Sequence, residues 1–253
     1  NSAGAGAVPT AGSVKIDGSN LGSALAGTIA ATRLSANTEA GFSIVAFEGN
    51  GVSGATVAHG LSKAPELVIV KATDATESWY TGSTAGSLDF TDYMRLNSTA
   101  ATADDIAKWN DADPSASVVT FGDDSSTNGS GTNFILYNFY SVEGYSKVGS
   151  YEGNGDADGS FIYTGFKPAF FMFKSSNQAD DWFMMDDKRN TYNLVNDHLK
   201  ANSNAAGATT SAGDCDFVSN GIKFRVDDNG NNSGYDYIYI AFAESPFKYS
   251  NAR

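Results

Sequence analysis

The sequence has one cysteine, Cys215, two histidines and no long apolar run. A single cysteine excludes an intramolecular disulfide framework, so packing or oligomerisation must stabilise the chain. The longest apolar stretches, such as residues 237–243, have the length of strands and fall well short of the roughly 18 residues that span a membrane. We therefore expect no insertion into a membrane.

Positive charge is also scarce. The chain has 16 Lys and Arg against 29 Asp and Glu, which gives a net charge of −13. Binding to a phosphate backbone depends on a basic surface, so this balance argues against nucleic acid as a partner. No secretory signal is visible and the chain begins with Asn1. We therefore expect either a processed protein or a piece of a longer one.

Glycine and aromatic residues are abundant instead. The chain has 27 glycines among 253 residues and 12% aromatic residues, while only 18% of its residues are charged. This mixture is typical of a turn-rich β protein and unlike a helical bundle. Short apolar segments alternate with polar, glycine-rich turns throughout, and this pattern predicts a β-sandwich or a jelly roll.

The second half of the chain repeats the first. The segment NFILYNF at 133–139 aligns with DYIYIAF at 236–242, which lies 103 residues further on, and the same offset carries Trp79 to Trp182. Further pairs at this offset are Pro65 and Pro168, Lys71 and Lys174, and Phe121 and Phe224. Self-similarity at a fixed period indicates a duplicated structural unit. We predict an all-β protein with two tandem sandwich units, residues 41–144 and residues 145–253.

Residues 1–40 have a different character, because they contain no aromatic residue and consist largely of Ala, Gly, Ser and Thr. Such a segment cannot form a core alone, so we interpret it as an extended N-terminal linker. It does carry a thin apolar stripe with spacings of four and five residues, formed by Leu21, Leu25, Ile29 and Leu34. The stripe needs burial against another chain or against the body. We predict oligomer contacts there, with a plain flexible tether as the alternative.

One turn resembles the first half of a calcium-binding loop. Asn154, Asp156 and Asp158 place oxygen ligands at alternating positions, before a glycine. The bidentate glutamate of such loops is missing, because Gly165 stands at the twelfth position. We therefore keep Ca²⁺ as a low-ranking cofactor and favour an ordinary solvated turn.

Other patterns that carry chemistry elsewhere are weak here. GNGVSG at 49–54 matches the dinucleotide fingerprint GxGxxG but is not followed by a helix, so a turn between strands is the better interpretation. Cys215 and His198 could be drawn as a thiol pair, yet a lone cysteine beside an apolar strand is usually buried. His59 and His198 do not correspond to each other, and neither has a nucleophile-elbow context. We therefore expect no enzyme.

Acidic residues gather only around Trp182, at Asp180, Asp181, Asp186 and Asp187. A glycosidase needs two carboxylates flanking the sugar, so this cluster keeps a glycan depolymerase open as an alternative. Among the aromatic residues, Trp79 and Trp182 recur at matching positions, which favours a core role for both. Trp109 lies in a polar context without a counterpart, and Tyr93 lies in the same unmatched region. We predict these two as exposed receptor contacts.

Several segments together resemble one family of proteins. They are GFSIV at 41–45, AHGL at 58–61, APELVIVK at 64–71, LNSTAA at 96–101, VEGYSKVGSY at 142–151 and the ending YIAFAESPFKYSNAR at 239–253. With these motifs, the chain from residue 41 onward resembles tail-fibre or fibre-like virion proteins of tailed phages of marine bacteria, including cyanobacteria. VKIDGSNL at 14–21 is similar to the short linker repeats that precede fibre tips.

The resemblance implies a structural or adsorption protein at the virion surface, often homotrimeric, with no catalytic residues to transfer. Its expected partners are copies of itself, other virion proteins, and a glycan or protein of the host surface. A capsid decoration or filament subunit without a receptor is a second possibility. The resemblance leaves tail and capsid locations open.

Overall fold

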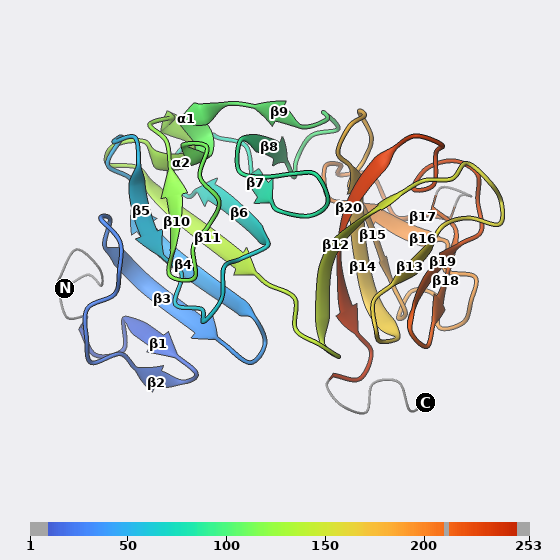
Figure 1. Ribbon diagram of the computed structural model, residues 1–253, viewed down its shortest axis with the longest axis horizontal. Coiled ribbons are helices and arrows are strands. Elements are labelled where there is room, and N and C mark those ends of the chain that lie inside the picture. Colours follow the sequence, from blue (N-terminus) through green and yellow to red (C-terminus); the bar gives the residue numbers. More distant parts are fainter. Residues whose placement is uncertain (1–9, 210–212, 247–253) are drawn as a thin grey trace. The chain divides into compact units, whose positions relative to one another are not determined.

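The computed structural model describes residues 10–209 and 213–246 and shows an all-β sandwich protein. The chain divides into two compact units (Figure 1). Unit 1 contains the residues up to 95 together with 103–140, and unit 2 contains 96–102 together with the residues from 141 onward. The expected division at 144 therefore lies close to the observed one, although the short segment 96–102 belongs to unit 2.

Unit 1 holds the first eleven strands and both short helices of the described chain. Their bounds are β1 (Val14–Ile16), β2 (Ser19–Asn20), β3 (Ala31–Asn37), β4 (Phe42–Glu48), β5 (Ala55–Ala58), β6 (Leu67–Ala72), β7 (Tyr80–Ser83), β8 (Asp92–Arg95), β9 (Ala103–Asp104), α1 (Ile106–Trp109), β10 (Val118–Phe121), α2 (Ser125–Asn128) and β11 (Asn133–Phe139). The described part of the chain contains no helix with the length and hydropathy needed to cross a membrane.

Unit 2 holds the remaining strands. Their bounds are β12 (Ser146–Glu152), β13 (Phe161–Tyr163), β14 (Pro168–Ser175), β15 (Phe183–Asp186), β16 (Asp197–Lys200), β17 (Ala208–Thr209), β18 (Cys215–Val218), β19 (Gly221–Phe224) and β20 (Asp236–Ala243).

The strand order confirms the duplication. The larger sheet of unit 1 has the order β2-β1-β3-β4-β11-β6-β7-β8-β9, and that of unit 2 has the order β12-β20-β14-β15-β16-β17. The run β4-β11-β6-β7-β8 thus corresponds to β12-β20-β14-β15-β16. The smaller sheets also correspond, because β10 pairs with β5 in unit 1 and β19 pairs with β13 in unit 2.

Aromatic side chains fill the space between the two sheets of each unit. In unit 1, the Phe47 ring of β4 lies 5.3 Å from the Phe121 ring of β10. In unit 2, the Phe173 ring of β14 lies 5.6 Å from the Phe224 ring of β19 in edge-to-face geometry. The run at residues 67–70 of β6 is buried throughout, as expected for a strand between two layers. These contacts make each unit a sandwich with its own core.

The interpretation of residues 1–40 as a linker is wrong for the part that the structure describes. β1 pairs with β3, and β3 pairs with β4, so these strands extend the larger sheet of unit 1 (Figure 1). Residues 1–9 lie outside the described residues. The segment needs no core of its own, because the edge of β4 supplies hydrogen bonds and an apolar face.

The four residues of the apolar stripe in this segment differ in burial. Ile29 and Leu34 are buried within unit 1, at 6% and 3% exposure. The prediction that these two residues contact a neighbouring chain is therefore wrong. Leu21 and Leu25 are half-buried, and their contact with a neighbouring chain stays a prediction.

Candidate functional site

A buried asparagine holds the glycine-rich turn near the start of each unit. In unit 2, Asn231 is fully buried, and its Nδ2 donates to Oδ1 of Asn154 (2.7 Å) and to the carbonyl of Asp156 (2.9 Å). Its Oδ1 accepts from the backbone N–H groups of Asn154 (3.2 Å) and Ser160 (3.1 Å). One amide side chain therefore closes this loop on itself.

Asn128 makes the equivalent hydrogen bonds in unit 1. It is fully buried, and its Nδ2 donates to the carbonyls of Gly122 (2.8 Å) and Val52 (3.1 Å), while its Oδ1 accepts from the N–H of Asn50 (3.0 Å). The two asparagines are 103 residues apart. The GxGxxG segment is thus a turn between β4 and β5, as expected, and the repeated asparagine belongs to the scaffold.

A repeated lysine also belongs to the scaffold. Nζ of Lys71 donates to the carbonyl oxygens of the next residue (2.6 Å) and of the residue four positions on (3.3 Å). Nζ of Lys174 makes the same two bonds at 2.8 Å and 3.3 Å. Burial lowers the pKa of Lys174 to about 8, although the nearby Asp180 and Asp181 carboxylates oppose this shift. Both lysines stabilise the turn that follows the strand.

The proposed calcium ligands make ordinary turn contacts instead. Oδ1 of Asn154 accepts from the N–H of Asp156 (3.1 Å), and Oδ1 of Asp156 accepts from the N–H of Asp158 (2.8 Å). The Asp158 carboxylate lies 2.8 Å from Nζ of Lys223, so an ammonium group already neutralises it. The described residues contain no cluster of three or more His, Cys, Asp or Glu that could hold a metal ion. The geometry favours the solvated turn.

Trp109 is fully buried, so the prediction of an exposed receptor contact is wrong for this residue. It ends α1, whose first turn is capped by Asp105, and its ring lies 5.3 Å from that of Phe90 and 5.6 Å from that of Phe121. The polar residues that follow it form a turn and leave the indole inside. Tyr93 is half-buried, and its contact with a receptor stays a prediction.

The other aromatic and thiol predictions divide as well. Trp182 is buried at 2% exposure, which confirms its core role, whereas Trp79 is half-buried and stacks with Tyr137 at 6.3 Å. Cys215 is fully buried, and burial raises the pKa of its thiol well above the usual range. Cys215 is therefore a small core residue.

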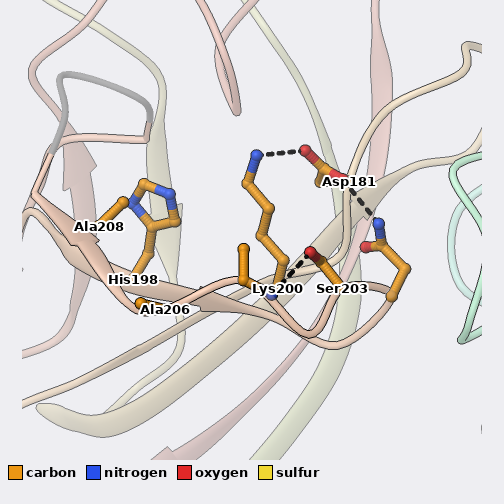
Figure 2. Close-up of a pocket in the computed structure, with 8 residues that line it drawn as sticks. Asp181, His198, Lys200, Ser203, Ala206 and Ala208 are labelled. Carbon is orange, nitrogen blue, oxygen red and sulfur yellow. Dashed lines mark hydrogen bonds and ion pairs between the residues drawn. The ribbon is translucent and has the colours of Figure 1, made fainter.

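A polar cavity of about 320 Å³ lies in unit 2 beside β16 and β17 (Figure 2). Its wall is formed by Asp181, His198, Lys200, Asn202, Ser203, Ala205, Ala206 and Ala208. His198 and Lys200 are two residues apart on β16, so both point to the same face of the sheet. The register places them opposite Met185 and Phe183 of β15. Strand pairing thus carries two basic side chains onto the inner face.

Lys200 and Asp181 meet across this cavity, as Figure 2 shows, with Nζ 2.5 Å from a carboxylate oxygen. The Asp181 carboxylate also accepts from Nδ2 of Asn202 at 2.6 Å. Oδ1 of Asn202 in turn accepts from the N–H of Trp182 at 2.7 Å. The buried indole of Trp182 therefore anchors the backbone that holds the whole polar group.

The charges of the cavity follow from these contacts. Burial alone would raise the pKa of Asp181, but the hydrogen bonds from Lys200 and Asn202 outweigh it and leave the pKa below the usual range. Burial lowers the pKa of His198. Its Nδ1 atom is buried and has no hydrogen-bond partner among the described residues. At neutral pH the cavity thus offers a carboxylate, which is paired with Lys200, and a neutral imidazole.

The wall of the cavity presents both hydrogen-bond donors and hydrogen-bond acceptors. The wall contains one carboxylate, whereas glycoside hydrolysis uses two on opposite sides of the bond. Fixed donors and acceptors together with small alanine walls are suited to a compact ligand that carries hydroxyl groups. Sequence reasoning noted Asp181 and His198 separately but missed Lys200 and Asn202. The pairing of β15 with β16 brings them together, and no local motif signals it.

Comparison with known families gives one match. Residues 15–246 match the family described as "Domain of unknown function (DUF7483)". The chain belongs to this family. The match begins within β1, so the DUF7483 domain includes the N-terminal strands as well as both sandwich units. No curated protein and no solved structure matches the chain.

Proposed function

We propose that this protein is a structural protein of a phage virion, a tail fibre or fibre tip that takes part in host attachment. The resemblance of residues 41–253 to fibre-like virion proteins supports the virion origin. The observation that carries the proposal is that residues repeated in both units have structural roles, whereas the cavity is formed by residues that are not repeated. The asparagine and lysine pairs common to both units hold turns, whereas the wall of the polar cavity is formed by residues of unit 2.

The cavity is the attachment site in this proposal, in place of the buried Trp109. A saccharide of the host surface fits its chemistry, because sugar hydroxyl groups both donate and accept hydrogen bonds. Asp181 accepts, while Lys200 and Asn202 donate, and all three are held in place by bonds to one another. Such preorganisation reduces the entropy lost on binding.

Adsorption tests this role of the cavity. Purified wild-type chain should compete with the phage for host cells, and Asp181→Ala should compete about tenfold less well, since lost charged hydrogen bonds cost about 1.4 kcal/mol or more. Asp227→Ala is the matched control, because Asp227 is exposed and lies outside the cavity wall. Equal competition by both variants would count against the cavity as the attachment site.

The location on the particle has a separate test. Gold-labelled antibodies against the folded chain should bind the ends of tail fibres on purified virions. Labelling over the capsid would favour the decoration subunit, and a protein absent from the virions would refute the virion proposal. Light scattering of the purified chain should give the mass of a homotrimer, which is the assembly that the resemblance implies.

A further inference from the structure

β13 lies at an edge of the smaller sheet of unit 2, in the order β13-β19-β18. Its two outward side chains are large and aromatic, with Phe161 49% exposed and Tyr163 65% exposed. Proteins usually protect an edge strand with charged residues, proline or a covering segment, because a free edge can pair with another chain. The two exposed rings on β13 depart from this practice.

The corresponding strand in unit 1 is β5. Val57 of β5 pairs with Val119, and Ile162 of β13 pairs with Ile222. Val119 and Ile222 are related by the repeat offset of 103 residues. Val57 and Ile162 therefore occupy equivalent places, and both are buried. The flanking positions of the two strands can be compared directly.

In unit 1 this edge is covered by the chain itself. The segment Gly27 to Ile29 forms bridges with Val57. The backbone N–H groups of Thr28 and Ile29 both donate to the carbonyl of Thr56 at 2.9 Å, and the N–H of Thr56 donates to Oγ1 of Thr28 at 2.8 Å. We call residues 27–29 the arm. The edge of β5 is thus completed by an extended segment of small and β-branched residues.

In unit 2 the same backbone groups face outward. Ser160 accepts a bond from the β18–β19 hairpin and Thr164 donates one to it, each at 3.1 Å. Because hydrogen-bonding direction alternates along an antiparallel strand, the N–H and C=O groups of Phe161 and Tyr163 point away from that hairpin. No strand or bridge of the described chain pairs with this side of β13.

We propose that β13 of unit 2 is a docking edge for an extended segment of another protein chain. The segment has the character of the arm, with small and β-branched residues, and adds to β13 as the arm adds to β5. Main-chain hydrogen bonds from Phe161 and Tyr163 hold it, and their rings pack against its alternate side chains. The site is separate from the polar cavity and does not depend on its ligand.

A synthetic peptide of residues 24–32 is a suitable probe, because it contains the arm. Added to the intact chain, it should slow hydrogen exchange at the amides of Phe161 and Tyr163 about tenfold or more. A peptide carrying Thr28→Pro lacks a central N–H donor and should give much weaker protection. If the unmodified peptide leaves both amides unprotected at saturating concentration, the proposal is wrong.

Two variants of one residue separate backbone pairing from ring contact. Tyr163→Pro removes an outward N–H and leaves the bonds to β19 in place, since proline is accepted on the free side of an edge strand. It should weaken peptide binding about tenfold, whereas Tyr163→Val keeps the N–H and should weaken it less than about threefold. Unchanged exchange of the Ile222 amide verifies that each variant is folded.

The pattern of results decides between partners. Equal loss in Tyr163→Pro and Tyr163→Val would mean that the ring alone makes the contact, which overturns strand addition. Shifts of the Phe161 and Tyr163 ring signals with a soluble oligosaccharide, without amide protection by the peptide, would make β13 a sugar platform and would also overturn the proposal. Protection by the peptide with a selective loss in Tyr163→Pro supports it.

Discussion

Units 1 and 2 share one strand order, but the edges of their sheets are covered differently. In unit 1 the N-terminal strands extend the edge of β4, and the arm covers β5. In unit 2 the corresponding strand β12 has no such neighbour in the described chain, and β13 is an edge. The duplicated part is therefore a scaffold that tolerates different additions at its edges. The places where the units differ are the places to look for function.

A second difference lies at the pairing of β7 with β8 and of β15 with β16. Register makes Tyr93 the counterpart of His198, because Tyr80 pairs with Arg95 as Phe183 pairs with Lys200. In unit 1 a lysine side chain covers the face of the sheet beside Tyr93.

This side chain is Lys108. Its ammonium lies 4.4 Å from the Tyr80 ring, 5.5 Å from the Tyr93 ring and 2.7 Å from the Asp124 carboxylate. In unit 2 the corresponding face borders the polar cavity. Of these two corresponding faces, the one in unit 2 is therefore the better candidate for a ligand site.

The largest effect should come from the repeated tryptophans. Trp182→Ala should destabilise unit 2 by about 4 kcal/mol, because a fully buried indole leaves a large cavity. Trp79→Ala should cost about half as much, since Trp79 is half-buried in unit 1. Chemical denaturation, monitored separately in each unit by hydrogen exchange, measures both decreases in the free energy of unfolding. Equal losses would show that the two positions are energetically equivalent despite their different burial.

The buried asparagines should come next. Asn231→Ala should destabilise unit 2 by about 3 kcal/mol, and Asn128→Ala should destabilise unit 1 by about 2 kcal/mol, because each leaves several backbone groups without partners. Asn231 should have the larger effect, since its bonds to Asn154 and Ser160 hold a longer loop. The matched control is Asn229→Ala, a half-buried position two residues earlier. A control as costly as Asn231→Ala would refute the special role of the amide.

Sequence reasoning predicted the duplicated strands well, because β6, β11, β14 and β20 are long apolar runs flanked by turns. It failed for β1–β3, whose residues are small, because β3 forms by pairing with β4 and β1 by pairing with β3. It failed for Trp109 because neighbouring polar residues describe the turn and not the direction of the indole. Asn128 and Asn231 could have been found, since they lie at the repeat offset. The cavity could not, because strand pairing assembles it from distant segments.

The buried Lys174 predicts a pH dependence. Its pKa of about 8 in the folded state is below the usual lysine value of 10.5, so the unfolded chain binds more protons between these values. Stability that depends on this lysine should therefore rise with pH across that window. Relative to Lys174→Met, the wild-type protein should gain roughly 2 kcal/mol between about pH 7.5 and pH 10. Denaturation at several pH values measures the difference, and parallel curves for the two proteins would contradict it.

The smallest expected effect is the difference in stability between variants of the two histidines. His59 in unit 1 is fully buried and fully bonded, with Nδ1 accepting from the N–H of Leu61 (3.1 Å) and Nε2 lying 3.1 Å from the carbonyl of Ser115. His59→Phe should cost about 2 kcal/mol, because both backbone groups lose their partner. His198→Phe should cost less than about 1 kcal/mol, since Nδ1 of His198 has no partner among the described residues and its ring already packs edge-on against Phe183 at 5.2 Å.

The same pair of variants bears on the cavity. If His198 serves a ligand and not the fold, His198→Phe should keep its stability and still weaken the competition for host cells. His59→Phe should show the reverse, with reduced stability and normal competition at a temperature where it is folded. Thermal melting and the adsorption assay together measure both properties. A His198→Phe variant that loses stability as strongly as His59→Phe would place this histidine with the scaffold.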